Sequence, residues 1–261
     1  MPPLGPDDYI EFARAFLPKK VASALLDLAL PTVALETRPI LDAHPSDTRL
    51  GGRPKVEPDF AWPCVDSRPA ALLAAVDLAA IGFSDPEQEA IDLGCLNIFY
   101  DVTAPELPGS NGRAAPALVH LSSKGIYEDR PTPANTPQYA SIVIDPVLQL
   151  SVPHPDEPIV AELAERYGPK MVKAHDALIE HLGAPRHRML GWPDLVAGPM
   201  QDALPELDAE TDGDWQLLAQ LDSDDALDWS WGNVGKLYVW VPEFDLADGR
   251  FDRCQVVVQS Y

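Results

Sequence analysis

The residues of this chain best suited to chemistry lie in its last third, around one histidine–arginine pair and one run of aspartates. His187 and Arg188 precede a Leu-Gly-Trp-Pro sequence, and Asp222, Asp224 and Asp225 follow a run of apolar residues. Carboxylates at the end of a strand can form an acid–base pair or bind a cation. The structural alternative, which we favour, is that Asp222 caps a helical turn whose dipole the other two aspartates complement.

The His187–Arg188 pair is open to two interpretations as well. As cationic and hydrogen-bonding groups, the two side chains can bind an anion. In a chain with 41 acidic residues they can also bond to neighbouring carboxylates, and we favour this second interpretation. Both residues are kept as candidate binding residues.

The acidic stretch 202–228 invites comparison with a calcium-binding loop. Every charged side chain between Arg188 and Lys236 is an Asp or a Glu. An EF-hand loop needs a bidentate acid at its twelfth position, and Ala219 stands there when the loop is counted from Asp208. We therefore predict a solvated acidic loop and no metal site.

Tryptophans crowd the last third of the chain, and exposed ones would mark a binding surface because tryptophan dominates interface hot spots. Trp215 and Trp240 fall in predicted strands and are expected in the core. Trp62 and Trp231 fall in predicted loops, which makes them the candidate surface tryptophans.

The sequence contains none of the common catalytic or nucleotide-binding motifs. No HExxH, G-x-S-x-G, P-loop or G-x-G-x-x-G sequence is present, and the six histidines are dispersed. Cys64, Cys95 and Cys254 are far apart, so neither a disulfide framework nor a zinc site fits them. We predict no cofactor and no transition metal, and the balance favours a protein that is not an enzyme.

The charge of the chain limits the kinds of molecule that it is expected to bind. Its 261 residues include 41 acidic and 19 basic ones, a formal charge of −22. Such a field repels nucleic acids and anionic lipid surfaces and attracts basic proteins or cations. No signal peptide and no apolar run long enough to span a membrane are visible, so we expect a cytoplasmic protein with reduced thiols.

The elements that must position these residues follow from the periodicity of apolar side chains. The 28 prolines predict short elements joined by many loops. Helices are predicted at 7–16, from Pro18, from Pro158 and around 171–182. Strands are predicted at 32–37, 71–76, 95–102, 117–121, 139–144, 147–152, 215–221, 236–241 and 254–259.

Three segments recur in the same order, about 140 residues apart, which indicates an internal repeat. The segments 50–54, 73–77 and 94–99 are similar to 190–193, 218–222 and 235–240. We predict an α+β fold whose two related halves, 48–102 and 188–242, share mixed or antiparallel sheets with helices packed outside. The predicted domains are a helical segment, 1–30, and a single domain, 31–261.

The same segments carry a resemblance to a known family. The sequence His-Arg-Met-Leu-Gly-Trp-Pro at 187–193, together with 215–224 and 231–240, resembles the YwqG-like family of bacterial proteins. The resemblance spans residues 35–261 and implies an α+β fold and a domain of unknown function. The family favours an acid after Trp-Gly, where this chain has Asn233, so Asn233 is a further candidate site residue.

Three functions follow from these observations. The first hypothesis is a non-enzymatic acidic protein that binds a basic protein, of which an immunity-type protein that neutralises a toxin is one form. The alternative is a cytoplasmic enzyme that uses the aspartate cluster with His187 for acid–base or metal-assisted chemistry. The second alternative is a sensor of a small ligand that binds at the seam between the halves.

Overall fold

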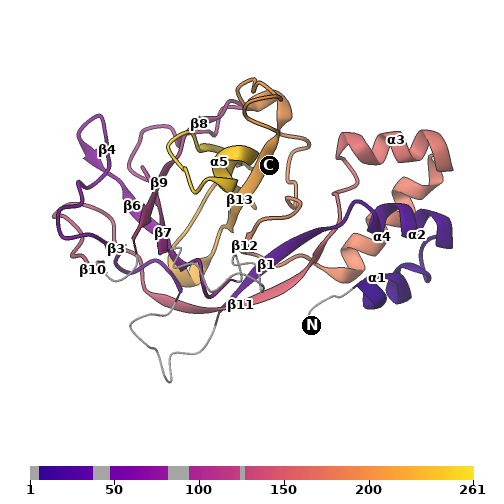
Figure 1. Ribbon diagram of the computed structural model, residues 1–261, viewed down its shortest axis with the longest axis horizontal. Coiled ribbons are helices and arrows are strands. Elements are labelled where there is room, and N and C mark those ends of the chain that lie inside the picture. The colour runs from indigo at the N-terminus through magenta and orange to yellow at the C-terminus, as the bar shows by residue number, and fades with distance from the viewer. Residues whose placement is uncertain (1–5, 38–47, 82–93, 124–126) are drawn as a thin grey trace.

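The computed structural model of the protein describes residues 6–37, 48–81, 94–123 and 127–261. These residues form one large antiparallel sheet that curls into a near-barrel, with a cluster of helices at one end of the molecule (Figure 1). Strands account for 31% and helices for 21%, so the protein is mostly sheet.

The helices are α1 (Pro6–Ala13), α2 (Lys19–Leu26), α3 (Pro158–Tyr167), α4 (Lys170–Leu182) and α5 (Glu243–Ala247), with short 3₁₀ turns η1 (Gln201–Ala203) and η2 (Asp225–Leu227). The strands of the first part are β1 (Leu30–Thr37), β2 (Arg49–Leu50), β3 (Lys55–Val56), β4 (Cys64–Val65), β5 (Arg68–Pro69), β6 (Ala71–Asp77), β7 (Cys95–Tyr100), β8 (Ala115–Pro116), β9 (Leu118–Ser122), β10 (Glu128–Asp129) and β11 (Ile142–Ser151). The remaining strands are β12 (Arg188–Met189), β13 (Trp215–Asp222), β14 (Lys236–Pro242) and β15 (Gln255–Gln259).

The large sheet has eleven strands in the order β8-β15-β14-β13-β12-β1-β11-β2-β6-β7-β9. Strands β8 and β9 stand at its opposite edges, although only Ala117 separates them in the chain. β8 pairs with β15, the amide of Ala117 donates to the carbonyl of Cys254, and β9 pairs with β7. One continuous segment, 115–122, therefore joins the two edges and closes the sheet.

Two sets of strands occupy matching places on either side of β1 and β11. In the sheet, β2, β6 and β7 follow one another as β12, β13 and β14 do. β6 has a bulge at 72–74 against β7, and β13 has one at 217–219 against β14. Arg49 of β2 and Arg188 of β12 consequently hold matching register positions.

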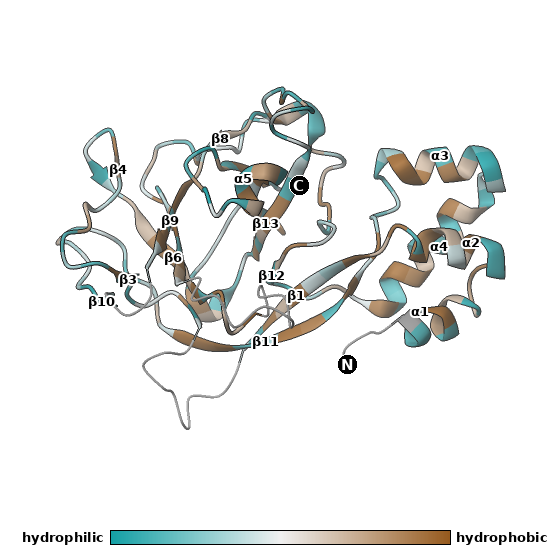
Figure 2. Cartoon of the chain, viewed as in Figure 1, coloured by the Kyte–Doolittle hydropathy of each residue, from teal (hydrophilic) through white to brown (hydrophobic). Residues whose placement is uncertain are grey.

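The main core fills the inside of this curled sheet. Apolar side chains of β6 and β7 lie in the same buried cluster as those of β13, β14 and β15, and Trp229 and Trp231 complete it. Figure 2 shows the hydrophobic colouring of these strands and the hydrophilic loops around them. The long-range pairing of sheet strands therefore buries one shared core.

The prediction of an α+β fold with two halves and helices packed outside the sheets is wrong, because the protein is mostly sheet and loops cover the outer faces of one continuous sheet. Phe60 and Trp62 pack on the outer side of β6 and β7. The outer side of β13 and β14 is covered by Leu195, Met200 and Leu204. A chain rich in proline can place single apolar side chains on a sheet from irregular loops, so no helix is needed there.

The apolar faces of α1–α4 cover one another instead. Buried residues of all four helices, among them Tyr9, Leu25, Val160 and Leu178, form one cluster away from the barrel core. The paired strands β1 and β11 run from the sheet body to this cluster (Figure 1). No helix within the described ranges is long and apolar enough to cross a membrane. The division into 1–30 and 31–261 remains a prediction.

The two strands predicted at 139–144 and 147–152 are a single strand, β11, that continues through Pro146. Proline lacks an amide hydrogen and interrupts a ladder on one side of a strand. β11 pairs with β1 along 144–151 but with β2 only at 142–143, so Pro146 lies where one side of β11 has no ladder to break.

Candidate functional site

The structure brings together three of the predicted site residues, His187, Asp222 and Asp224. The His187 ring is buried between two partners: its Nδ1 accepts the amide hydrogen of Asp222 at 3.1 Å, and its Nε2 lies 3.2 Å from Oδ2 of Asp224. Because Nδ1 accepts, the proton of the neutral ring sits on Nε2 and is donated to Asp224. Trp229 packs edge-on against the ring. His187 thus joins β12 to the end of β13.

The capping role predicted for Asp222 belongs to Asp224. The side chain of Asp224 accepts the amide hydrogen of Ala226 at 2.8 Å and so caps η2. Its Oδ2 also lies 3.3 Å from Arg186, whose guanidinium bonds to the carbonyl of Ser223. Asp224 is buried and Asp225 is exposed, so these two aspartates cannot act as an adjacent carboxylate pair.

Burial and hydrogen bonds shift the pKa values of the three residues in this cluster. It lowers the pKa of His187 and raises the pKa of Asp222, while hydrogen bonds from His187 and Ala226 outweigh burial and lower the pKa of Asp224. Protonation of His187 would turn Nδ1 into a donor facing the amide of Asp222. The neutral ring is therefore the form that fits this site.

We expect the stability of the protein to fall as pH drops below about 6.5, the usual pKa of histidine. Since the folded pKa of His187 is depressed, the unfolded chain binds its proton first, and unfolding becomes easier by up to about 1.4 kcal/mol per pH unit. His187→Gln should flatten this acid-side decline in urea unfolding measured at several pH values between about 5 and 7.5. The exposed His181→Gln is the control, and parallel curves for wild type and His187→Gln would contradict the assignment.

The two candidate surface tryptophans differ from the prediction. Trp231 is buried, with 2% of its surface exposed, and stacks edge-on with Tyr100 inside the barrel. Trp62 is half-buried, and its indole donates to the carbonyl of Ala70 at 2.9 Å. Trp240 is buried, as predicted, and Trp215 is half-buried. Trp231 is therefore not a surface residue, and Trp62 is only partly exposed.

Asn233 lies on an exposed turn, where its carbonyl accepts the amide of Tyr261. The acidic stretch 202–228 is ordered by its own contacts: Asp212 bonds to Arg253, and the amide of Asp208 donates to Asp212. Within the described residues no group of three or more His, Cys, Asp or Glu could hold a metal ion. Asp212 is thus engaged with an arginine rather than placed as a calcium ligand.

Arg188 is the predicted site residue with the least ordinary surroundings. Only 5% of its surface is exposed, and its guanidinium bonds to two neutral groups, the carbonyls of Trp192 at 3.0 Å and Pro185 at 3.5 Å. Its Nε has no hydrogen-bond partner among the described residues. The nearby Asp194 is ion-paired with Lys236. The interpretation that Arg188 bonds to a neighbouring carboxylate is therefore wrong.

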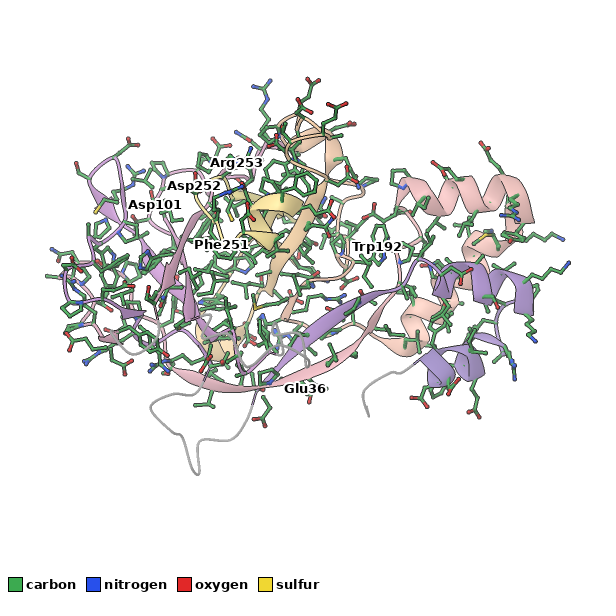
Figure 3. The ribbon with its side chains drawn as sticks, viewed as in Figure 1. Glu36, Asp101, Trp192, Phe251, Asp252 and Arg253 are labelled. Carbon is green, nitrogen blue, oxygen red and sulfur yellow. The ribbon has the colours of Figure 1, made fainter. Side chains whose placement is uncertain are left out.

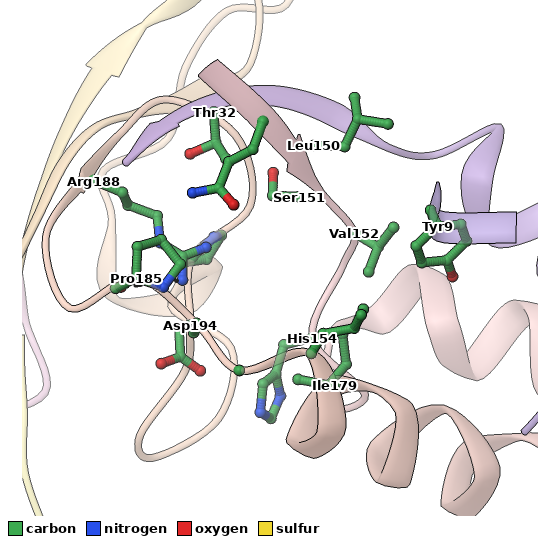
Figure 4. Close-up of a pocket in the computed structure, with 15 residues that line it drawn as sticks. Tyr9, Thr32, Leu150, Ser151, Val152, His154, Ile179, Pro185, Arg188 and Asp194 are labelled. Atoms are coloured by element: carbon green, nitrogen blue, oxygen red, sulfur yellow. Dashed lines mark hydrogen bonds between the residues drawn. The ribbon is translucent and has the colours of Figure 1, made fainter. Parts of the chain in front are cut away.

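A pocket lies beside Arg188, where β1 and β11 meet the end of α4 and the loop that contains Pro185. It encloses about 70 Å³. In Figure 4, Arg188 lies near Thr32 and Ser151 on the side of the sheet. The wall toward the helices combines the apolar Leu150, Val152 and Ile179 with Tyr9 and His154.

The loop that follows β12 is held in a strained conformation against this pocket. Leu190 and Gly191 have φ angles of 59° and 73°, and the hydroxyl of Thr32 donates to the carbonyl of Leu190 at 2.9 Å. A Cβ on Gly191 would lie 2.3 Å from the hydroxyl oxygen of Ser151, so only glycine fits there. A left-handed leucine costs free energy, and such strain concentrates at functional sites.

Trp192 fixes the same loop to the helical end of the molecule. It lies between the sheet body and the helix cluster (Figure 3), and its indole donates to the carbonyl of Leu28 at 2.7 Å. Its amide donates to Ser151 at 2.9 Å. Thr32 and Ser151 were not predicted as site residues, because no motif marks them and only the pairing of β1 with β11 brings them to Arg188.

Comparison with known proteins adds one assignment. A search of curated proteins finds no match to the chain. A family model described as a domain of unknown function, DUF1963, matches residues 48–259. This range contains Arg188 and His187, together with all strands of the large sheet except β1. The chain therefore belongs to the DUF1963 family.

Proposed function

We propose that this protein binds a small anionic molecule, without converting it, in the pocket beside Arg188. The observation that carries the proposal is a buried guanidinium that lines a pocket and bonds to no carboxylate among the described residues. Of the functions considered from the sequence, a sensor of a small ligand agrees best with this geometry. We also propose that the chain belongs to the YwqG-like group and that it is cytoplasmic. A cytoplasmic location agrees with its three free cysteines.

The energetic argument rests on the cost of burying a charge. An arginine side chain does not lose its proton in proteins, so it cannot escape burial by becoming neutral. A buried ion without an opposite charge is destabilising by several kcal/mol, and neutral carbonyls compensate for only part of this cost. Asp194 and Asp222 attract Arg188 electrostatically but do not hydrogen-bond to its guanidinium, so an anion in the pocket would supply an opposite charge in direct contact with it.

The alternative of an enzyme built on His187 has less support. The hydrogen bonds of its ring nitrogens are used within the protein, by Asp222 on one side and Asp224 on the other. Asp224 in addition caps η2 and contacts Arg186. These contacts explain the cluster as a structural link between β12 and the end of β13, and they leave neither ring nitrogen of His187 for a substrate.

The test is isothermal titration calorimetry with acetate, phosphate and sulfate, each against wild type and Arg188→Met. We expect at least one anion to bind wild type at one site per chain and to lose at least about tenfold in affinity in Arg188→Met, since a charge-assisted bond is lost. Arg186→Met is the matched control, because Arg186 is exposed and does not line the pocket. Its affinity should equal that of wild type.

Stability and salt dependence distinguish this function from others. Arg188→Met should not lower the free energy of unfolding of the empty protein by more than about 1 kcal/mol, since the loss of the bonds to two carbonyls is offset by the removal of a buried charge without an ion-pair partner. Association of the anion should speed up with ionic strength, because the charge of −22 repels it. A basic protein, the second candidate partner, would associate more slowly as salt rises. Failure of all three anions to bind wild type would overturn the proposal.

A further inference from the structure

A second arginine of the protein, Arg49, occupies a position in the sheet that matches that of Arg188. Arg49 pairs with Ala75 of β6 as Arg188 pairs with Gln220 of β13, and both arginines are followed by a buried apolar residue and two positive φ angles. The guanidinium of Arg49 is occupied by a carboxylate: its two Nη atoms lie 3.3 and 2.5 Å from the two oxygens of Asp129 in β10.

Within the part of the chain that the structure describes, no segment supplies such a carboxylate to Arg188. Its two Nη atoms bond to the carbonyls of Pro185 and Trp192, and its side chain faces a pocket where Arg49 faces β10. Both arginines leave Nε without a partner, so the difference between them is confined to the carboxylate. Each Nη carries two hydrogens, and a single carbonyl uses one of them.

We infer that the ligand of this pocket is a short carboxylic acid, whose carboxylate takes at Arg188 the place that Asp129 takes at Arg49. This inference rests on the function proposed above and names its ligand class. A planar guanidinium matches a carboxylate with two parallel hydrogen bonds. The hydroxyl groups of Thr32 and Ser151 donate to carbonyls of the chain and orient the loop around this charge.

The size of the pocket limits the rest of the ligand. Its 70 Å³ corresponds to room for about five water molecules. The wall toward the helices combines the apolar Leu150, Val152 and Ile179 with Tyr9 and His154, so a short tail of mainly aliphatic character is expected there. A free acid of a few carbons fits these limits, whereas a peptide that ends in a carboxylate is too large to enter fully.

The experiment compares four probes by calorimetry on the full chain: butyrate, its neutral isostere butyramide, phosphate, and a tripeptide with a free carboxyl terminus. We expect butyrate to bind at least about tenfold more tightly than phosphate and butyramide, and more tightly than the tripeptide. Arg188→Lys keeps a positive charge but lacks the planar fork, so the preference for butyrate over phosphate should shrink severalfold. Arg186→Met should keep the preference of wild type.

The outcomes separate this inference from the proposed function. Phosphate binding as tightly as butyrate at a site lost in Arg188→Met would refute the carboxylate while the anion pocket stands. Butyramide binding as tightly as butyrate would refute it too. A tripeptide that binds more tightly than butyrate would overturn the assignment to a small free acid. If no anion binds, both proposals fail together.

Discussion

Gly51→Ala is expected to lower the free energy of unfolding by at least about 4 kcal/mol, enough to leave much of the protein unfolded. Gly51 has a φ angle of 66°, and an added Cβ would lie 2.2 Å from the carbonyl oxygen of Ala140. The amide of Gly51 also donates to the carbonyl of Leu73 at 2.7 Å, so the turn cannot move away without loss of that bond. Backbone atoms of Leu73 and Ala140 thus fix the position of Gly51 and leave no room for a Cβ.

Gly112→Ala is the matched control for this substitution. Gly112 has a φ angle of 75°, but a Cβ there meets nothing within 4 Å. Its cost should be that of a left-handed alanine alone, about 1–2 kcal/mol. Urea unfolding followed by tryptophan fluorescence measures both variants. Equal losses for Gly51→Ala and Gly112→Ala would show that the contact with Ala140 relaxes freely, contrary to our expectation.

Asn97→Ala is expected to cost about 2–4 kcal/mol, the second largest effect among our predictions. Asn97 is fully buried in β7, where its Oδ1 accepts the amide of Lys55 and its Nδ2 donates to the carbonyl of Lys55, both at 2.9 Å. Nδ2 also bonds to the hydroxyl of Ser122 at 3.1 Å. The side chain therefore holds β3 and β9 to β7, and its loss leaves a buried amide without a partner.

Asn233→Ala serves as its control. Asn233 is exposed, and its backbone carbonyl, which the substitution keeps, accepts the amide hydrogen of Tyr261. Its unfolding free energy should match that of wild type within about 0.5 kcal/mol. The comparison uses the same urea titration. A loss below about 1 kcal/mol for Asn97→Ala would mean that water or a shift of β3 replaces the missing bonds.

The positions of most strands follow from the sequence, but their assembly does not. The apolar runs at 71–76, 215–221 and 236–241 are strands because alternate side chains enter one core, a property of local pattern. Closure of the sheet depends on a change of partner strand at Ala117, which the apolar run 117–121 does not reveal, and on the pairing of β8 with the distant β15. The amphipathic faces of the helices predicted burial, yet such a face does not say whether a sheet or another helix will cover it.

For the candidate site, too, the sequence predicts which residues matter but not how they are arranged. His187 and the aspartates were found because titratable side chains near a strand end are recognisable in sequence. Their roles were not, since a hydrogen bond such as that from His187 to Asp224 spans residues far apart in the chain. Arg188 could be chosen as a residue, but its lack of a carboxylate is a property of the folded surroundings. Only the register of β12 reveals that Arg49 is its counterpart.

Closure of the sheet by segment 115–122 also governs the order in which the chain can fold. The partner of β8 is β15, which ends at Gln259, and β12 pairs with β1 on one side and with β13 on the other. During synthesis the barrel must therefore stay open until β15 has left the ribosome. Contacts between residues so far apart in the chain are formed slowly. The nascent protein thus exposes unpaired strand edges for most of its synthesis, a period in which its charge of −22 keeps neighbouring chains apart.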